Sequence, residues 1–245
     1  LHGDGEGLLG GFIVSPTAAR SLAQNMPSAY NLLPSPAYFN AVSDPAITFA
    51  DVSFTEPWRT FWGPFLNVYS DFFEFATGQG VVRTKPPEDL LRMPEVLNPA
   101  FMIAAANFHN EYDTYAFPDH IRVVQVAGWG RPTVKAVRYR TNHFLQSYET
   151  LFTREGDSTV VYPSAISSVA DETYFFNIFD YNDFFSEDSQ HKDLFSTISL
   201  QSLVEAVVKG QNVQETNFIS STKPPLDDLD DQLLVSTHSP VILGA

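Results

Sequence analysis

The sequence predicts an α/β fold that holds the later strands of a mostly parallel sheet, a covering helix and an inserted cap rich in aromatic residues. Three short β-branched stretches lie between positions 121 and 179, an amphipathic stretch follows at 199–210, and an irregular proline- and aromatic-rich segment occupies 34–94. At 245 residues with 44% hydrophobic and 14% aromatic content, the chain has enough apolar surface to fold.

Charge and composition exclude several function classes. The chain carries 14 basic and 29 acidic residues, and its formal charge of −15 would repel nucleic acid and anionic lipid. The absence of cysteine excludes disulfides and thiolate metal sites, but it leaves the compartment open, with a secreted or periplasmic protein slightly favoured. No apolar run approaches the ~20 residues of a membrane span, and no signal peptide is evident. Because the chain starts at Leu1, we expect an internal piece of a longer protein.

The first 94 residues predict loops followed by a cap. The glycine-rich opening at 2–7 is a turn signal, and it lacks the lysine and spacing of a phosphate-binding loop. Further along, Phe61, Phe65 and Tyr69 recur with Phe72 at the spacing of one helical face. Such a face can pack on the domain, or it can line a lid or acyl-chain groove. We therefore take Phe61, Phe65 and Tyr69 as candidate substrate-binding residues.

Regular elements are clearest after position 98. Asn98 can cap a helix that runs to about Tyr112, with Pro99 in its first turn, and the His109 near its end is expected to be packed or solvated. Strands are predicted at 121–127, 134–139 and 173–179, and a final helix at 199–210 is expected to begin at a Ser199 cap and end at Gly210. The remaining tail is an acidic linker into a β element at 233–243.

Three sequence blocks resemble the lecithin:cholesterol acyltransferase family of α/β-hydrolases. They are a glycine-turn-Pro-Thr segment before a tyrosine-bearing strand, a Gly-Asp-x-Thr-Val loop, and a histidine before a closing helix, here at 128–139, 156–160 and 191–194. A Pro-Ser-x-x-x-Leu-Leu-Pro stretch at 27–34 adds to the likeness. The resemblance covers roughly 20–34 and 123–210.

The resemblance implies the later part of an α/β-hydrolase, with Asp157 as the acid and His191 as the base of a catalytic triad. Trp129, which stands in the first of the three blocks, is a further candidate substrate-binding residue. We expect four parts along the chain: a sheet-edge segment of the hydrolase core at 1–33, an inserted cap or lid at 34–117, the C-terminal half of the core at 118–210, and an acidic linker with the start of a β element at 211–245.

Residue chemistry agrees with these roles. Asp157 stands in a short polar loop between apolar runs, where its carboxylate could orient an imidazole, and His191 follows 34 residues later. This fold orders its triad as serine, acid and histidine along the chain. Asp157 also has a simpler explanation, because an aspartate after a glycine is common in turns, where its side chain bonds its own backbone.

The nucleophile is missing from this sequence. A nucleophile elbow requires Gly-x-Ser-x-Gly, and the 245 residues contain no such pentapeptide. Ser28 precedes Asp157 but has no flanking glycine, and the resemblance makes it a landmark after the nucleophile. We expect the serine and oxyanion hole to lie upstream of Leu1, so the isolated chain should be nearly inactive.

Neither a cofactor nor a metal is expected. The six histidines are scattered without metal-ligand spacing, although Asp180, Asp183, Glu187 and Asp188 could gather a hard cation or simply form a solvated loop.

The sequence therefore predicts part of a serine esterase, lipase or acyltransferase that acts on a lipid or other ester. The alternative is a non-catalytic domain or pseudoenzyme with an apolar partner groove. Expected partners are the substrate and the missing N-terminal half of the protein. A half sheet leaves an unpaired edge, so the isolated chain could also form a homo-oligomer.

Overall fold

The computed structural model describes residues 16–81, 94, 96–140 and 148–225 of the chain. Its helices and strands alternate irregularly along the sequence. In chain order they are α1 (Pro16–Asn25), α2 (Pro27–Tyr30), α3 (Pro36–Ala41), β1 (Ile47–Phe49), α4 (Glu56–Trp62), β2 (Phe65–Leu66), α5 (Tyr69–Thr77), α6 (Pro99–Tyr112), β3 (Val124–Trp129), β4 (Thr133–Tyr139), β5 (Tyr148–Thr153), α7 (Tyr162–Ala165), β6 (Glu172–Asn177), α8 (Ile178–Phe185), the 3₁₀ helix η2 (His191–Ser196), α9 (Ile198–Val208) and β7 (Ile219–Ser220).

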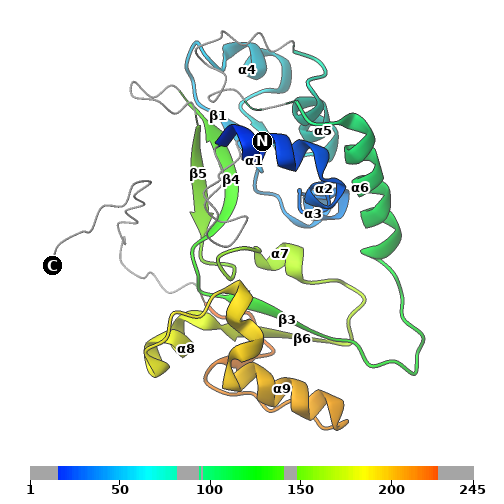
Figure 1. Cartoon of the computed structure of the whole chain (residues 1–245), viewed down its shortest axis with the longest axis vertical. Helices are drawn as coiled ribbons and strands as arrows, with labels where there is room; N and C mark the ends of the chain where they lie inside the picture. Colours follow the sequence, from blue (N-terminus) through cyan, green and yellow to red (C-terminus); the bar gives the residue numbers. More distant parts are fainter. Residues whose placement is uncertain (1–15, 82–93, 95, 141–147, 226–245) are drawn as a thin grey trace, which may run out of the picture.

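The described strands form two mixed sheets, which lie one above the other along the long axis in Figure 1. The upper sheet has the order β2-β1-β4-β5 and the lower sheet the order β3-β6-β7. Only the β1–β4 and β3–β6 pairs are parallel. The α/β class is confirmed, whereas the expectation of a mostly parallel sheet was wrong. Strands that follow each other closely, such as β4 and β5, pair antiparallel because a parallel pair requires a long crossover.

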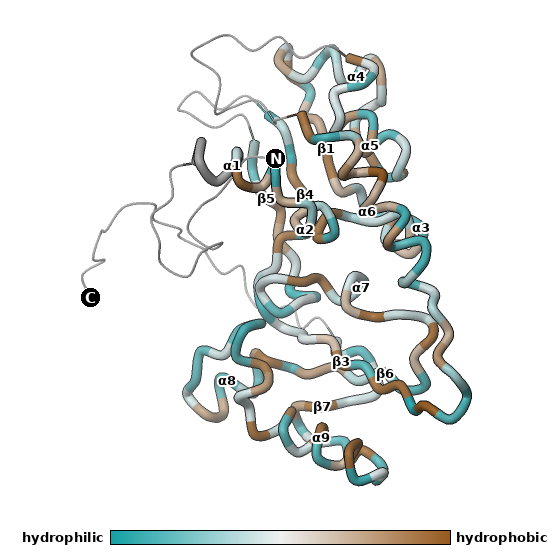
Figure 2. Tube along the Cα trace, turned by 45° about the vertical axis from the view of Figure 1, so that its right-hand side comes forward, coloured by the Kyte–Doolittle hydropathy of each residue, from teal (hydrophilic) through white to brown (hydrophobic). Residues whose placement is uncertain are grey.

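An aromatic core joins the upper sheet to the helices beside it. Phe75 on α5 is fully buried, and its ring centroid lies 5.4 Å from that of Phe49, 5.3 Å from Trp58 and 5.6 Å from Tyr139. These rings come from α5, β1, α4 and β4, so the segment predicted as a cap and the segment predicted as hydrolase core share one sheet and one core. Figure 2 shows the hydrophobic positions that line these elements.

The predicted aromatic helix face between positions 61 and 73 was wrong. Phe61 lies in the last turn of α4, Phe65 lies in β2, and Tyr69 is the first residue of α5. Gly63 interrupts the helical pattern at φ +84°, a backbone conformation that favours glycine over other residues. The three- to four-residue spacing of these aromatic residues is therefore spread over α4, β2 and α5 and does not mark one helix.

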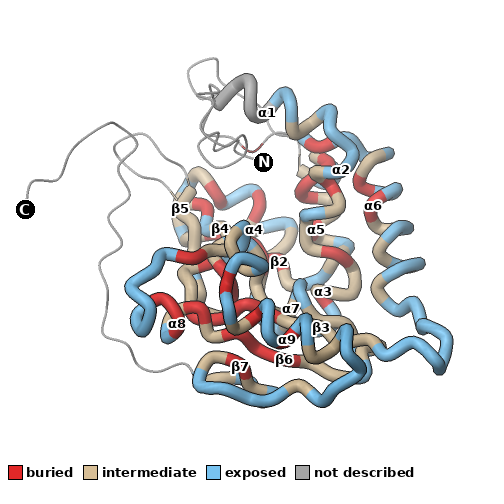
Figure 3. The backbone as a smooth tube through the Cα atoms, turned by 60° about the horizontal axis from the view of Figure 1, so that its bottom comes forward, coloured by how far each residue is buried: buried red, intermediate tan, exposed pale blue. Residues whose placement is uncertain are grey.

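The lower sheet is covered by α8 and α9. Phe176, Ile178 and Tyr181 pack with Leu200 and Leu203 of α9 in a second core, and Figure 3 shows buried residues along β6. The predicted final helix is confirmed, and Gly210 adopts the expected left-handed conformation at φ +65°. The expected cap was wrong, because Thr197 and not Ser199 occupies the N-cap position.

The helix predicted at 98–112 is confirmed as α6. Asn98 accepts a hydrogen bond from the Ala100 backbone at 2.9 Å, and Pro99 occupies the first turn. Most residues of α6 are exposed (Figure 3), and its buried residues are Met102 and Ala105. Among the described helices, none is both long and apolar enough to span a bilayer. The glycine-rich opening and the β element expected at 233–243 lie outside the described residues.

We predict that Phe75→Ala lowers the free energy of unfolding by about 3–5 kcal/mol, because it leaves a cavity in a closely packed aromatic core. The matched control is Phe61→Ala, which truncates a ring that is more than half exposed and should cost less than about 1 kcal/mol. Chemical denaturation followed by tryptophan fluorescence measures both. Equal losses in the two variants would contradict this assignment of the core.

Candidate active site

A short loop at 154–161, here called the acid loop, presents Asp157 beside the end of β3. Two backbone hydrogen bonds fix its first part: Gly130 N donates to Arg154 O at 2.8 Å, and Arg131 N donates to Gly156 O at 3.0 Å. The neck of the loop is closed where Tyr162 N donates to Glu155 O at 2.8 Å. The loop is therefore tied to the turn that follows β3 and also to itself.

The buried Asp157 carboxylate divides its two oxygens between two tasks. Oδ1 accepts the backbone N–H groups of Thr159 at 3.0 Å and Val160 at 2.8 Å, which folds the acid loop around the side chain. Oδ2 lies 2.7 Å from Nδ1 of His191. Asp157 is only 4% exposed, and these three bonds compensate for removing its charge from water.

Thr133 supports the tightest point of the acid loop. Its buried hydroxyl donates to Arg131 O at 2.9 Å and accepts Ser158 N–H at 2.9 Å. Ser158 has a φ of +78°, a conformation that costs a non-glycine residue about 1–2 kcal/mol. The hydrogen bond from Thr133 helps to hold this residue in place.

Two glycines allow the close approach of the acid loop. A Cβ atom at Gly128 would lie 2.5 Å from Cβ of Asp157, and one at Gly156 would lie 2.5 Å from Oγ1 of Thr133. Both distances are shorter than atomic contact permits, so a larger residue would displace Asp157 or its support. Gly128 and Gly156 in the sequence blocks are thus explained by the lack of space for a Cβ atom beside Asp157 and Thr133.

His191 approaches from the other side on a loop with its own support. The Asn182 side chain exchanges two 3.0 Å hydrogen bonds with the backbone of Ser189, and both residues are buried. The 3₁₀ helix η2 starts at His191, capped by reciprocal bonds between Gln190 and Asp193. His191 N also donates to Asp157 O at 3.1 Å, so the two residues are joined through backbone and side chain.

The imidazole of His191 is bound on one side and open on the other. Its side chain is 47% exposed, and within the described part of the chain Nε2 makes no hydrogen bond. The 2.7 Å contact from Nδ1 to a carboxylate favours a proton on Nδ1, which leaves a lone pair on Nε2 when the ring is neutral. This arrangement can accept a proton from a nucleophile and return it to a leaving group.

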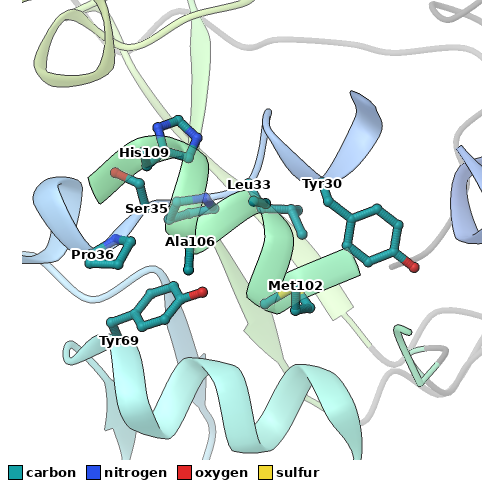
Figure 4. A pocket seen from close by; sticks show the side chains of 10 residues that line it. Tyr30, Leu33, Ser35, Pro36, Tyr69, Met102, Ala106 and His109 are labelled. Atoms are coloured by element: carbon teal, nitrogen blue, oxygen red, sulfur yellow. The ribbon is translucent and has the colours of Figure 1, made fainter. Parts of the chain in front are cut away.

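A second histidine–aspartate pair provides a contrast. His109 Nδ1 lies 2.9 Å from Asp113 Oδ1, but its Nε2 lies 3.0 Å from the carbonyl oxygen of Asn31, so both nitrogens are engaged. His109 borders a pocket with Ser35 and Tyr69 (Figure 4). The pocket holds about 10 Å³, which is room for about one water molecule. This pair joins α6 to the turn between α2 and α3.

The four predicted substrate-binding aromatics do not surround His191. Phe61 is exposed on α4, which lies at the opposite end of the long axis from α8 and α9 (Figures 1 and 2), and Phe65 is exposed on β2, which pairs with β1 in the upper sheet. Tyr69 lines the small pocket near His109. Trp129 lies near the acid loop but is only 2% exposed, with its ring against Tyr162. A substrate-binding role for all four residues stays a prediction.

The acidic residues considered for a cation have other partners or face solvent. Asp188 forms a 2.7 Å ion pair with Arg131, and Glu187 accepts a hydrogen bond from Ser189. In the residues that the structure describes, no group of three or more carboxylates or histidines is arranged to hold a metal ion.

Several residues that shape the site had no assigned role from sequence. The buried amide of Asn182 and the ion pair of Arg131 with Asp188 depend on distant segments meeting, and no local pattern marks them. Thr133 did stand within a sequence block, so only its function was missed.

Comparisons of this chain with protein-family models, with curated proteins and with solved structures return no match.

We predict that Thr133→Val, which keeps the shape but removes the hydroxyl, lowers the free energy of unfolding by about 1–3 kcal/mol and exposes the Ser158 amide to exchange. Thr133→Ser keeps the hydroxyl and should retain protection of that amide, although the lost methyl costs about 1 kcal/mol. Denaturation and amide hydrogen exchange by NMR measure the two effects. Equal Ser158 exchange in both variants would rule out the proposed role of the hydroxyl.

Proposed function

We propose that this chain supplies the acid and base of a serine esterase, lipase or acyltransferase of the α/β-hydrolase class. The observation that carries the proposal is the Asp157–His191 pair, in which a buried carboxylate binds Nδ1 at 2.7 Å while Nε2 stays open. The resemblance of the three sequence blocks to the lecithin:cholesterol acyltransferase family supports it, because the same blocks build the acid loop and η2.

In the proposed reaction, Nε2 of His191 takes the proton of a serine hydroxyl as the serine oxygen attacks the ester carbonyl carbon. The proton then passes to the alkoxide that leaves, and an acyl-serine remains. A water or alcohol next gives its proton to Nε2 and attacks the acyl carbon, and His191 returns that proton to the serine oxygen. Asp157 holds the Nδ1–H and stabilises the imidazolium in both steps.

An apolar substrate is supported by side chains on the same segment as His191. Phe195 in η2 is 76% exposed and Ile198 at the start of α9 is also exposed, while Phe184 lies exposed at the end of α8. Contiguous exposed apolar side chains are typical of binding surfaces, and we propose that these three residues contribute to one. We therefore propose a lipid or other ester with an acyl chain.

The serine is proposed to come from protein outside these 245 residues, which contain no Gly-x-Ser-x-Gly. The sheet order supports a further neighbour, since β3 stands at the edge of the described β3-β6-β7 sheet and pairs with a parallel strand on one side only. An unpaired strand edge offers backbone N–H and C=O groups to another strand. The occupant we propose is the N-terminal half of the same protein.

A non-catalytic role is the second candidate, and one observation favours it. The Asp157 carboxylate also satisfies two backbone amides, so the loop would need an acid at this position even without chemistry. Only activity measurements on the complete protein separate a catalytic pair from a structural one.

We predict that in the full-length protein His191→Ala lowers kcat/KM for p-nitrophenyl esters by about a millionfold and Asp157→Asn by about ten thousandfold. His109→Ala is the matched control, because it breaks the other histidine–aspartate pair and should leave turnover of the folded protein within a few-fold of wild type. Short and long acyl chains are assayed side by side. Unchanged turnover in His191→Ala would exclude His191 from the mechanism.

We also predict that a fluorophosphonate probe, which labels activated serines, leaves the 245-residue chain unlabelled. The full-length protein should take up one label on a glycine-flanked serine upstream of position 1, located by peptide mass spectrometry. Labelling of Ser28, or the lack of any labelled serine in the full-length protein, would refute this assignment of the nucleophile.

A further inference from the structure

The acid loop has a second attachment that the proposed mechanism does not use. Lys223 lies far along the chain, yet its Nζ forms a 2.5 Å ion pair with Oε1 of Glu155, two residues before Asp157. The same Nζ lies 4.5 Å from the ring centroid of Tyr162 and 5.2 Å from that of Trp129. One ammonium group therefore contacts β3, the neck of the acid loop and the start of α7.

The segment that carries Lys223 is itself anchored. β7 pairs with β6, where Ile219 lies opposite Phe176 and is buried in the lower core. Two bonds tie β7 and the residue after it to the residues before it: Thr216 N donates to Ile219 O at 2.9 Å, and Ser221 N donates to Glu215 Oε1 at 3.0 Å. Residues 215–223, here called the strap, thus bring Lys223 to the acid loop from a fixed position on the sheet.

The charges at the contact favour a lasting attachment. Partial burial acts to lower the pKa of the Lys223 ammonium, but the hydrogen bond and charge of Glu155, together with Tyr162, outweigh it and raise that pKa. Lys223 therefore stays charged through the neutral pH range. A cation over aromatic faces adds about 0.5–2 kcal/mol of attraction, depending on its exposure.

We propose that Lys223 is a positioning residue, which fastens the neck of the acid loop so that Asp157 keeps its hydrogen bond to His191. This inference rests on the proposed function for its catalytic meaning. Its physical basis is independent, because Glu155 and Tyr162 are the two residues whose backbone bond closes the neck, and Lys223 contacts both side chains.

The test uses the 245-residue chain and NMR, so it does not depend on activity. The readouts are hydrogen exchange of the Thr159 and Val160 amides, which bind Asp157, and exchange of the proton that His191 Nδ1 shares with Asp157. Lys223→Met keeps the aliphatic stem and removes the charge. We expect it to speed exchange at these sites by about tenfold, with little change in thermal midpoint.

Three further variants make the outcome decisive. Lys223→Arg keeps the charge and the aromatic contacts and should restore exchange to within about threefold of wild type, while Glu155→Gln should act like Lys223→Met. The matched control is Lys209→Met, which breaks the exposed ion pair with Glu205 on α9. The proposal is overturned if Lys223→Met exchanges like wild type, if Lys209→Met has an equal effect, or if Lys223→Arg is as impaired as Lys223→Met.

Failure of the proposed function would give a different experimental result from failure of the proposal for Lys223. Full-length protein without esterase activity would remove the catalytic meaning of the Asp157–His191 pair, but the exchange rates of the acid loop in these variants would be unaffected by that result.

Discussion

The buried carboxylate of Asp157 is the group on which the site depends. A charge taken out of water must be compensated by hydrogen bonds, and here two backbone amides and one imidazole provide them. Everything around the acid loop follows from that requirement: Gly128 leaves room for the side chain, Thr133 holds the strained Ser158, and His191 arrives on a loop fastened by Asn182. Gly128, Thr133 and Asn182 do not bind the carboxylate themselves, but they hold the groups that do, so their loss should weaken the hydrogen bonds of a buried charge as well as removing a contact of their own.

The turn explanation and the triad explanation of Asp157 proved compatible. From sequence they were alternatives, because an aspartate after glycine either bonds its own backbone or orients a histidine. The structure uses one oxygen for each, with Oδ1 on the loop amides and Oδ2 on His191. The division has a physical advantage, since the amides fix the plane of the carboxylate and hence the direction from which the imidazole can bind. A structural role for the loop is therefore a precondition of the proposed catalytic role and does not compete with it.

Sequence patterns predicted the elements whose signals are local. Asn98 and Pro99 define the start of α6, β-branched runs mark β3, β4 and β6, and Gly210 ends α9. The same patterns failed where packing between distant segments decides the result. The aromatic spacing from Phe61 to Tyr69 imitated a helix because two turns and a two-residue strand happened to preserve it. Neither the ring contacts of Phe75 nor the return of Lys223 to Glu155 leaves a local signal, because each joins residues that lie far apart in the sequence.

The contrast between the two histidine–aspartate pairs shows why geometry is needed beyond the pair itself. Both place Nδ1 within hydrogen-bond distance of a carboxylate, and either would look like a dyad if only that distance were considered. His109 turns its second nitrogen to a backbone carbonyl, which leaves it no free position for a reacting proton. His191 has a half-exposed side chain, and within the described residues its second nitrogen makes no hydrogen bond. A general base must have one nitrogen oriented and the other open, and of these two pairs only Asp157–His191 meets both conditions.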